Sequence, residues 1–191
     1  MLQRTVQKGD WCLGLVGNYR IMTAGYAMTK PLRFADPQKA TGCPRMFFVT
    51  SQTASGKPLF QTERMASLLI DVIRGQMRAG RMTVHDFVVM PDHLHILMTL
   101  PGDLSVEKEM QLVKGGFSFR GGKELGFRGE IWQRGFTDVI IADEESEARH
   151  CAYIDQNPVK AGLANLIGEY PFGSAHLKKL KARGLKPLPL L

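Results

Sequence analysis

Two histidines separated by one leucine are the first residues in the sequence that suggest chemistry. His93 and His95 belong to the segment MPDHLHIL at residues 90–97. Side chains two residues apart in a β-strand lie on the same face, so both imidazoles would point to one side while Leu94 points to the other. Neutral imidazole is a common ligand of divalent transition metals. The pair is a candidate metal site, although partly exposed strand histidines without a ligand are an equally ordinary source of this pattern.

A tyrosine and an asparagine one helical turn apart are the second candidate. Tyr153 and Asn157 lie in the segment CAYIDQNP at residues 151–158, so a phenol and an amide carbonyl would face the same point. Taken separately, a helical tyrosine is usually a packing residue, and an asparagine before proline usually marks a helix end. Beside a pair of imidazoles, however, they would place a nucleophile next to a metal with an oxygen ligand. That arrangement suits attack on a phosphodiester.

The sequence before and around the histidines predicts the elements that would position them. A run of β-branched and aromatic residues predicts a strand, and apolar residues at three- and four-residue steps predict an amphipathic helix. Two apolar runs separated by Pro91-Asp92 then predict a hairpin whose second strand carries the histidines. The predicted ranges are residues 46–51 for the strand, from near Thr62 to before Gly80 for the helix, and 84–90 and 94–100 for the hairpin.

Further along, the sequence predicts a helix, a glycine-rich passage, a strand and a last helix. The passage is predicted to be flexible or turn-rich because glycine pairs at 115–116 and 121–122 bracket it. The last helix begins with acids that suit a helix N-terminus and ends at Asn157-Pro158. The order βαββαβ followed by a helix carrying the tyrosine predicts an α+β, ferredoxin-like sandwich with helices on one face of an antiparallel sheet. The predicted ranges are 104–117, 138–142 and 143–156.

Four segments resemble, in the same order, the motifs of a known family. They are MPDHLHIL at 90–97, EIWQRGF at 130–136, YIDQNPVKAGL at 153–163 and YPFGS at 170–174. These segments are similar to the histidine-hydrophobe-histidine box, the tryptophan-glutamine-arginine segment, the tyrosine helix and the tyrosine-proline-serine segment of the HUH single-tyrosine transposases, in their REP-associated branch. The resemblance covers roughly residues 45–176. The chain departs from it after Phe136, where it lacks the tyrosine and histidine that many relatives have.

The resemblance implies a metal-dependent single-strand DNA endonuclease and strand transferase that works through a 5′-phosphotyrosine, usually beside a DNA hairpin. On this chain it implies Tyr153 as the nucleophile, His93 and His95 as metal ligands, and Asn157 as the third ligand. The implied metal is Mg²⁺ or Mn²⁺, although imidazole ligands would also accept zinc, cobalt or nickel.

The nucleophile needs a proton acceptor that the sequence does not name. A free phenol has a pKa of about 10, so Tyr153 would need help to lose its proton. His85 and His150 are candidate bases, and His150 lies three residues before Tyr153 on the same helical face. A surface histidine is the alternative for each. Because one tyrosine per chain supports one cleavage per site, exchange of two strand ends would need a homodimer or two successive events.

Basic and aromatic residues alternate along residues 114–134. Such a pattern suits phosphate contacts and base stacking on single strands or hairpin loops. A basic helix flank beside core aromatics is the alternative for each aromatic residue. The residues predicted to contact DNA are Lys114, Arg120, Lys123, Arg128, Trp132 and Arg134.

Composition agrees with a nucleic-acid partner. The chain carries 25 lysines and arginines against 18 acids, a net charge of +7, which favours polyanions. Three cysteines without a C-x-x-C pair predict neither a disulfide framework nor a cysteine zinc site, and no apolar run approaches the ~18 residues of a membrane span. We therefore expect a soluble, cytoplasmic, nucleoid-associated protein. Its predicted parts are a loosely ordered extension (1–44), the nuclease domain (45–176) and a basic tail (177–191).

Two other functions compete with the transposase interpretation. A catalytically silent module could keep the fold and bind hairpin DNA or RNA without cleaving it. A generic ferredoxin-like RNA-binding domain would present strand aromatics such as Phe47, Phe48 and Phe87 to bases. The RNA-binding interpretation leaves the histidine pair without a purpose, which favours the transposase.

Overall fold

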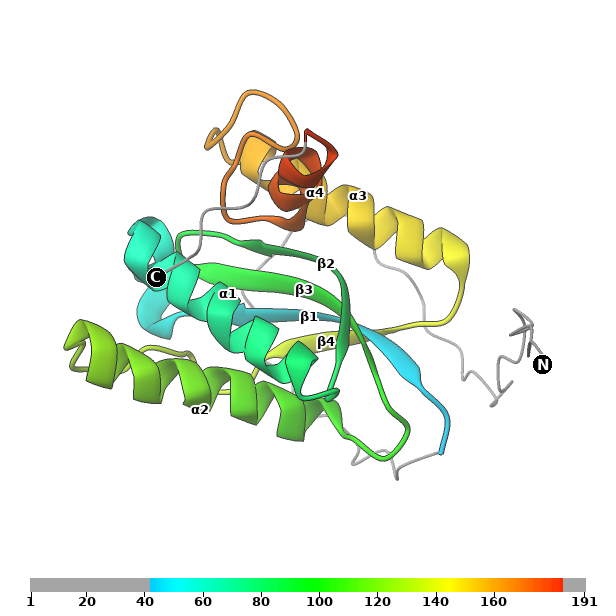
Figure 1. Ribbon diagram of the computed structural model, residues 1–191, viewed down its shortest axis with the longest axis horizontal. Coiled ribbons are helices and arrows are strands. Elements are labelled where there is room, and N and C mark those ends of the chain that lie inside the picture. The colour runs from blue at the N-terminus through cyan, green and yellow to red at the C-terminus, as the bar shows by residue number, and fades with distance from the viewer. Residues whose placement is uncertain (1–41, 184–191) are drawn as a thin grey trace. The chain divides into compact units, whose positions relative to one another are not determined.

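A four-stranded antiparallel sheet forms the centre of residues 42–183, the part of the chain that the computed structural model describes (Figure 1). The predicted N-terminal extension, residues 1–44, lies almost entirely outside the described residues, and so does the end of the predicted tail, residues 184–191.

The order of elements confirms the predicted ferredoxin-like class. The chain runs β1-α1-β2-β3-α2-β4 and then adds the tyrosine helix, and the strands lie in the sheet in the order β2-β3-β1-β4 with every neighbouring pair antiparallel. The hairpin around Pro91-Asp92 is present as predicted. The strands are β1 (Arg45–Gln52), β2 (Thr83–Val89), β3 (His93–Leu100) and β4 (Thr137–Ile141).

Helices cover both faces of the sheet. Helices α1 (Glu63–Arg78) and α2 (Val106–Leu125) pack on one face over the main apolar core (Figure 1). Helix α3 (Glu144–Lys160) lies on the other face, where a second, smaller core forms. Helix α4 (Ser174–Ala182) lies beside β2, and its Leu177 packs against the main core. The tyrosine helix is therefore opposite α1 and α2, whereas the sequence predicted helices on one face only. Successive side chains of β1 point to opposite faces, so the strand contributes to both cores. Phe47 belongs to the first core and Met46 to the second.

The glycine-rich passage is helical, which corrects the prediction of a flexible segment. Helix α2 continues through both glycine pairs to Leu125 and ends at Gly126, whose φ of 67° is the left-handed conformation common at a helix C-terminus. A Cβ built on Gly116 would lie 3.4 Å from Cγ1 of Val72 in α1. Phe117 beside it is fully buried. Tertiary packing between α1 and α2 thus outweighs the low helix propensity of glycine.

Helix α3 also continues past its predicted end at Asn157-Pro158. Pro158 lies within the helix, and its side chain is buried. Proline removes only the N–H that would bond to the carbonyl of Ile154, and the following turn is closed by other donors. The backbone N–H of Ala161 donates to the carbonyl of Asn157 at 3.0 Å. Tyr153 and Asn157 consequently keep the one-turn spacing of an intact helix.

The first six residues of the predicted basic tail belong to α4 (Ser174–Ala182), a helix that the sequence analysis did not predict. Among the described residues, no helix is long and apolar enough to cross a membrane.

Candidate active site

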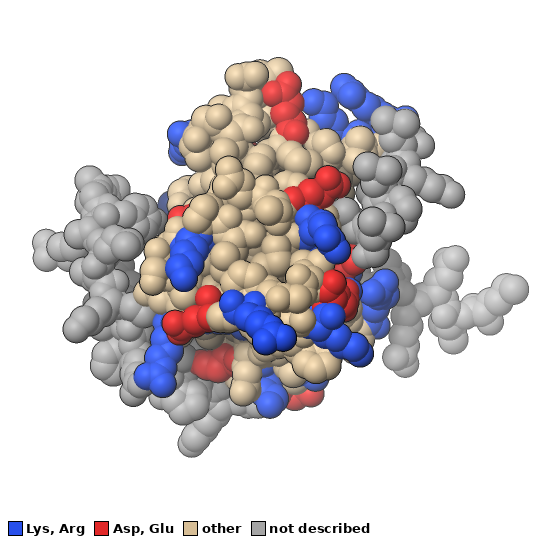
Figure 2. All heavy atoms as spheres, turned by 90° about the vertical axis from the view of Figure 1, so that its left-hand side faces the viewer, with Lys and Arg blue, Asp and Glu red and all other residues tan. Residues whose placement is uncertain are grey.

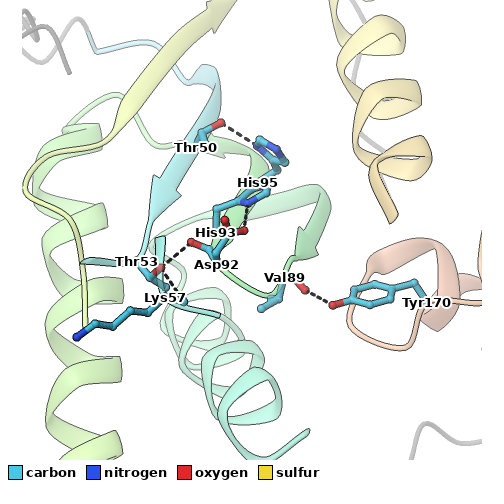
Figure 3. Close-up of polar contacts among 8 residues, drawn as sticks. All are labelled: Thr50, Thr53, Lys57, Val89, Asp92, His93, His95 and Tyr170. Carbon is cyan, nitrogen blue, oxygen red and sulfur yellow. Dashed lines mark hydrogen bonds and ion pairs between the residues drawn. The ribbon is translucent and has the colours of Figure 1, made fainter. Parts of the chain in front are cut away.

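The two histidines of β3 lie on the face of the sheet that α3 covers. Leu94 between them is fully buried in the core on the opposite face, as strand alternation requires. The ring centroids of His93 and His95 are 4.6 Å apart. The turn before them is fixed by Thr53, whose backbone N–H donates to the carbonyl of Asp92 at 2.8 Å. The Thr53 hydroxyl lies 3.0 Å from the same carbonyl and 2.7 Å from that of Lys57 (Figure 3). The position of the pair is thus set by the residue that follows β1 as well as by β3.

Each imidazole has a polar partner at its Nδ1 atom (Figure 3). Nδ1 of His95 lies 2.8 Å from the hydroxyl of Thr50, its partner in the β1–β3 register. Nδ1 of His93 lies 2.6 Å from a carboxylate oxygen of Asp92. Burial, and after it the charge of His93, lowers the pKa of His95 to about 3. The His95 ring is therefore neutral at neutral pH, which is the state in which an imidazole binds a cation.

Tyr153 reaches the histidines from α3. Its ring centroid lies 5.2 Å from that of His95 and 5.9 Å from that of Phe48, both edge to face. Phe48 in turn stacks on His95 at 5.4 Å. The N-terminus of α3 is capped by Asp143, whose side chain accepts a hydrogen bond from the Ser146 backbone N–H at 2.6 Å. The helix is then held against the sheet by the smaller core, to which Ile154 belongs. The fold thus brings together the phenol and both imidazoles.

Asn157 lies one helical turn after Tyr153 and is half-buried. Its role as a third ligand stays a prediction. Within residues 42–183 no group of three His, Cys, Asp or Glu side chains is arranged to hold a metal ion. A cation held by the two imidazoles would therefore take its further donors from an amide, from water or from the DNA.

Comparisons with known proteins agree with this geometry. The sequence pattern of the family described as "Transposase IS200 like" matches residues 49–157, a range that includes both histidines and Tyr153. The chain belongs to this transposase family.

Three relatives narrow the resemblance to the REP-associated branch. This transposase is 30% identical over 131 residues to a protein of Haemophilus influenzae named as a REP-associated tyrosine transposase, covering 60% of this chain and 74% of that protein. It is 32% identical over 106 residues to the REP-associated tyrosine transposase of Escherichia coli, covering 55% and 60%. A solved structure of a REP-associated tyrosine transposase bound to a REP hairpin matches with a TM-score of 0.58 and 27% identity, covering 84% of this chain and 89% of that chain.

Two residues predicted to contact DNA make contacts within the protein of this transposase. Trp132 is 8% exposed and packs against Phe60 and Phe117 in the main core, so its ring faces protein. The ammonium of Lys114 donates to the carbonyls of Gln133 and Gly135 at 2.8 and 2.7 Å. Both residues hold the segment before β4 against α2. Their contact with DNA stays a prediction.

The other four predicted DNA contacts lie at or near the surface. Arg120 is paired with Glu124 one helical turn away, at 2.6 Å. The ammonium of Lys123 lies 5.9 Å from the centroid of the Phe119 ring. Arg128 and Arg134 are exposed. The backbone N–H of Gln133 donates to the carbonyl of Gln52, which lies opposite His93 in the sheet. Arg134 follows Gln133 and is therefore near the site.

The two candidate bases occupy different places. Nδ1 of His150 lies 2.7 Å from the carbonyl of Ser146, and the His150 ring is 4.7 Å from Phe48, so His150 belongs to the surroundings of the site. Nε2 of His85 lies 2.7 Å from the hydroxyl of Thr99, toward the other end of β2 and β3.

Sequence reasoning missed three residues of the site. Thr50 and Phe48 lie on β1, more than forty residues before His95, and only the β1–β3 register brings them to it. No local pattern could have indicated either residue. The sequence predicts Asp92 as part of a turn, and a carboxylate directly before a candidate ligand is the signal that would indicate its role.

Proposed function

We propose that this transposase cleaves and rejoins single-stranded DNA through a covalent 5′-phosphotyrosine at Tyr153, at sites beside DNA hairpins. The observation that carries the proposal is the meeting of three rings from two elements, with the Tyr153 centroid 5.2 Å from His95 and the His95 centroid 4.6 Å from His93. A structural role alone would not require a phenol beside two imidazoles on a covered face of a sheet.

The residues of the site fit a divalent cation, Mg²⁺ or Mn²⁺. His93 and His95 would hold it through Nε2, because Nδ1 of each ring already has a partner. Asn157 would supply an oxygen from α3. A bound cation would polarise a phosphoryl oxygen and so make the phosphorus more electrophilic. The neutral state of His95 favours this role, since a protonated imidazole has no lone pair for a metal.

The reaction follows from the position of Tyr153. Its phenolic oxygen would form a bond to the phosphorus while the bond from phosphorus to the 3′ oxygen of the preceding nucleotide breaks. The phenol proton would pass to a base or to water, and the leaving oxygen would take up a proton to become a 3′-hydroxyl. Rejoining reverses these steps with a 3′-hydroxyl as the attacking group. The phosphotyrosine retains the bond energy that rejoining needs.

The hairpin as the recognised form of DNA rests on the matched relative, which was solved bound to a REP hairpin. The net charge of +7 supports a polyanionic partner of this kind. Of these, only the relative favours a hairpin over an unstructured single strand.

A denaturing-gel assay tests the proposal. Wild-type protein, Mn²⁺ or Mg²⁺ and a labelled single-stranded hairpin DNA are expected to give a cleaved product and a protein-linked band. Tyr153→Phe should abolish both, because phenylalanine has no oxygen to attack the phosphorus. Tyr170→Phe is the matched control, since Tyr170 donates its hydroxyl to the carbonyl of Val89 and should retain the activity (Figure 3). A protein-linked band from Tyr153→Phe would reject the proposal.

A further inference from the structure

We infer that Thr50 and Asp92 are positioning residues, which hold His95 and His93 in the tautomer that carries the proton on Nδ1 and leaves Nε2 for a cation. The inference rests on the proposed function and assigns roles to two residues outside the predicted constellation. Thr50 contributes from β1 and Asp92 from the turn before β3.

The contact of His93 allows one direction of hydrogen bonding. An ionised carboxylate only accepts, so the 2.6 Å contact with Asp92 requires the hydrogen to be on Nδ1 of His93. The backbone of Asp92 is fixed beside His93 because its carbonyl accepts from the Thr53 N–H at 2.8 Å. With Nδ1 protonated, a neutral His93 ring carries its lone pair on Nε2. The carboxylate thus selects the nitrogen that would coordinate.

The contact of His95 also engages Nδ1, here with a hydroxyl that can accept from an Nδ1–H. Thr50 lies directly opposite His95 in the register of β1 and β3, and its hydroxyl is 2.8 Å from Nδ1. A hydroxyl accepts as readily as it donates, so Thr50 satisfies an Nδ1–H inside a site where His95 is only 5% exposed. The ring contacts with Phe48 and Tyr153 limit rotation of the imidazole as well. Thr50 therefore fixes the orientation of His95, and its hydroxyl oxygen is the acceptor that the inferred tautomer needs at Nδ1.

A second histidine–threonine pair on the same sheet uses the other ring nitrogen. His85 contacts the hydroxyl of Thr99 at 2.7 Å, but through Nε2. Both histidines of the site instead engage Nδ1 and keep Nε2 for another partner. Partners of this kind raise the basicity of a ligating imidazole and commonly change metal affinity 10–100-fold. The His85–Thr99 pair supplies a matched control on the same sheet.

The first experiment measures Mn²⁺ binding to the full chain without DNA, by the electron paramagnetic resonance signal of free Mn²⁺. Thr50→Val removes the hydroxyl at nearly constant volume and should weaken binding about 10–100-fold. Thr50→Ser keeps a hydroxyl and should restore affinity close to that of the wild type. Asp92→Ala should weaken binding to a similar degree, and Thr99→Val should leave it unchanged. Thermal unfolding of each variant identifies any that fail to fold.

The second experiment reads the tautomers directly, by ¹⁵N NMR of the histidine rings in the metal-free protein. Wild type should show a protonated Nδ1 and an unprotonated Nε2 for both His93 and His95. Thr50→Val should give a mixture of tautomers at His95 alone, which a merely structural role for Thr50 would not produce. A wild-type His95 with its proton on Nε2 would overturn the role of Thr50, and the same finding at His93 would overturn that of Asp92.

Failure of the proposed metal site and failure of the positioning roles alone would give different results. Wild-type protein that binds no Mn²⁺, or that binds it equally well after His95→Ala, would overturn the proposed metal site and with it the positioning roles. Binding that His95→Ala abolishes but Thr50→Val and Asp92→Ala leave intact would overturn the positioning roles alone.

Discussion

Phe48 is the residue that links the two sides of the site. Its half-buried ring stacks on His95, tilts against His150 at 4.7 Å and meets the edge of Tyr153. It also packs against the smaller core that holds α3 to the sheet. The distance between the nucleophile and the histidines therefore depends on the volume of this one side chain.

Removal of the Phe48 ring should weaken the packing that holds Tyr153 close to the histidines. Phe48→Ala should lower the free energy of unfolding by about 2 kcal/mol, less than the 3–5 kcal/mol typical of a fully buried ring, and should slow formation of the covalent adduct. Phe119→Ala is the control, because Phe119 is 69% exposed on α2. Chemical denaturation and the gel assay measure the two effects. A wild-type adduct rate in Phe48→Ala would contradict a spacing role.

At this scale, local spacing made part of the site predictable. His93 and His95 are two apart in a strand, and Tyr153 shares a helix with Asn157, so each pair could be recognised within a few residues of sequence. Thr50 and Phe48 could not, because a threonine and a phenylalanine in a strand have no spacing that distinguishes them from ordinary packing residues. Their roles arise from strand register, which is a property of the folded sheet.

Among the elements, the segment leading into α4 closes the edge of β2. The carbonyl of Phe172 accepts from the backbone N–H of Val89 at 2.8 Å, and the Tyr170 hydroxyl donates to the carbonyl of the same residue at 2.9 Å. Ser174, the first residue of α4, donates its hydroxyl to the buried carboxylate of Asp86. The ammonium of Lys178 lies 3.5 Å from the other oxygen of that carboxylate. The YPFGS segment thus anchors α4 to the strand beside β3.

Loss of the Ser174 hydroxyl should loosen this anchor. Ser174→Ala leaves the carboxylate of Asp86 with one donor fewer in a buried position, so the free energy of unfolding should fall by about 1–3 kcal/mol. Ser118→Ala is the matched control, because the Ser118 hydroxyl bonds within α2 to the carbonyl of Lys114 and should change stability by about 0.5 kcal/mol or less. Chemical denaturation measures both. Equal effects of the two variants would show that the anchor adds no stability.

Tyr170 in the same segment should make the free energy of unfolding depend on pH in the alkaline range. Burial raises the pKa of Tyr170 from 10.0 to about 12. Because the unfolded chain releases this proton first, the contribution of Tyr170 to stability is complete below pH 10 and is lost as the pH rises toward 12. The difference in unfolding free energy between wild type and Tyr170→Phe should therefore shrink across that range. Denaturant titrations from pH 8 to pH 11.5 would measure this difference. A difference that stays constant over the range would contradict the raised pKa of Tyr170.

The elements themselves were mostly predictable, and the exceptions share a cause. Strand alternation and helical periodicity placed the four strands, α1 and the start of α3 within a few residues of their observed bounds. The predictions went wrong where local preference and packing disagree, at the glycine pairs of α2 and at Pro158 of α3. In both cases contacts with other elements keep a helix intact through residues that disfavour it. Helix α4 was read as tail because its lysines dominate the pattern.

At the scale of the whole molecule, basic and acidic side chains are mixed on the face that Figure 2 shows. On the face shown in Figure 2, lysine and arginine side chains lie among acidic ones, mostly in the lower part, at the height of α2 in Figure 1. A net charge of +7 draws DNA to such a surface, but it does not by itself select the place where a strand enters the site. Charges near the histidines are therefore expected to contribute most to productive binding.

Arg134 is the exposed charge that tests this expectation. Arg134→Ala should weaken hairpin binding and reduce the slope of log affinity against log salt by about one, as expected when one phosphate contact is lost. Arg74→Ala is the control, because Arg74 pairs with Asp71 on α1, which covers the face of the sheet opposite the histidines, and should leave the slope unchanged. Fluorescence anisotropy at several salt concentrations gives both slopes. Identical slopes in the two variants would exclude Arg134 as a phosphate contact.

The attachment point of DNA tests the central claim most directly. The chain contains four tyrosines, and trypsin would release Tyr153 within residues 150–160, a peptide with no other tyrosine. Tandem mass spectrometry of the digested covalent adduct is predicted to place a nucleotide 5′-phosphate on the oxygen of Tyr153. Attachment to any other residue, or linkage through a 3′-phosphate, would contradict the account.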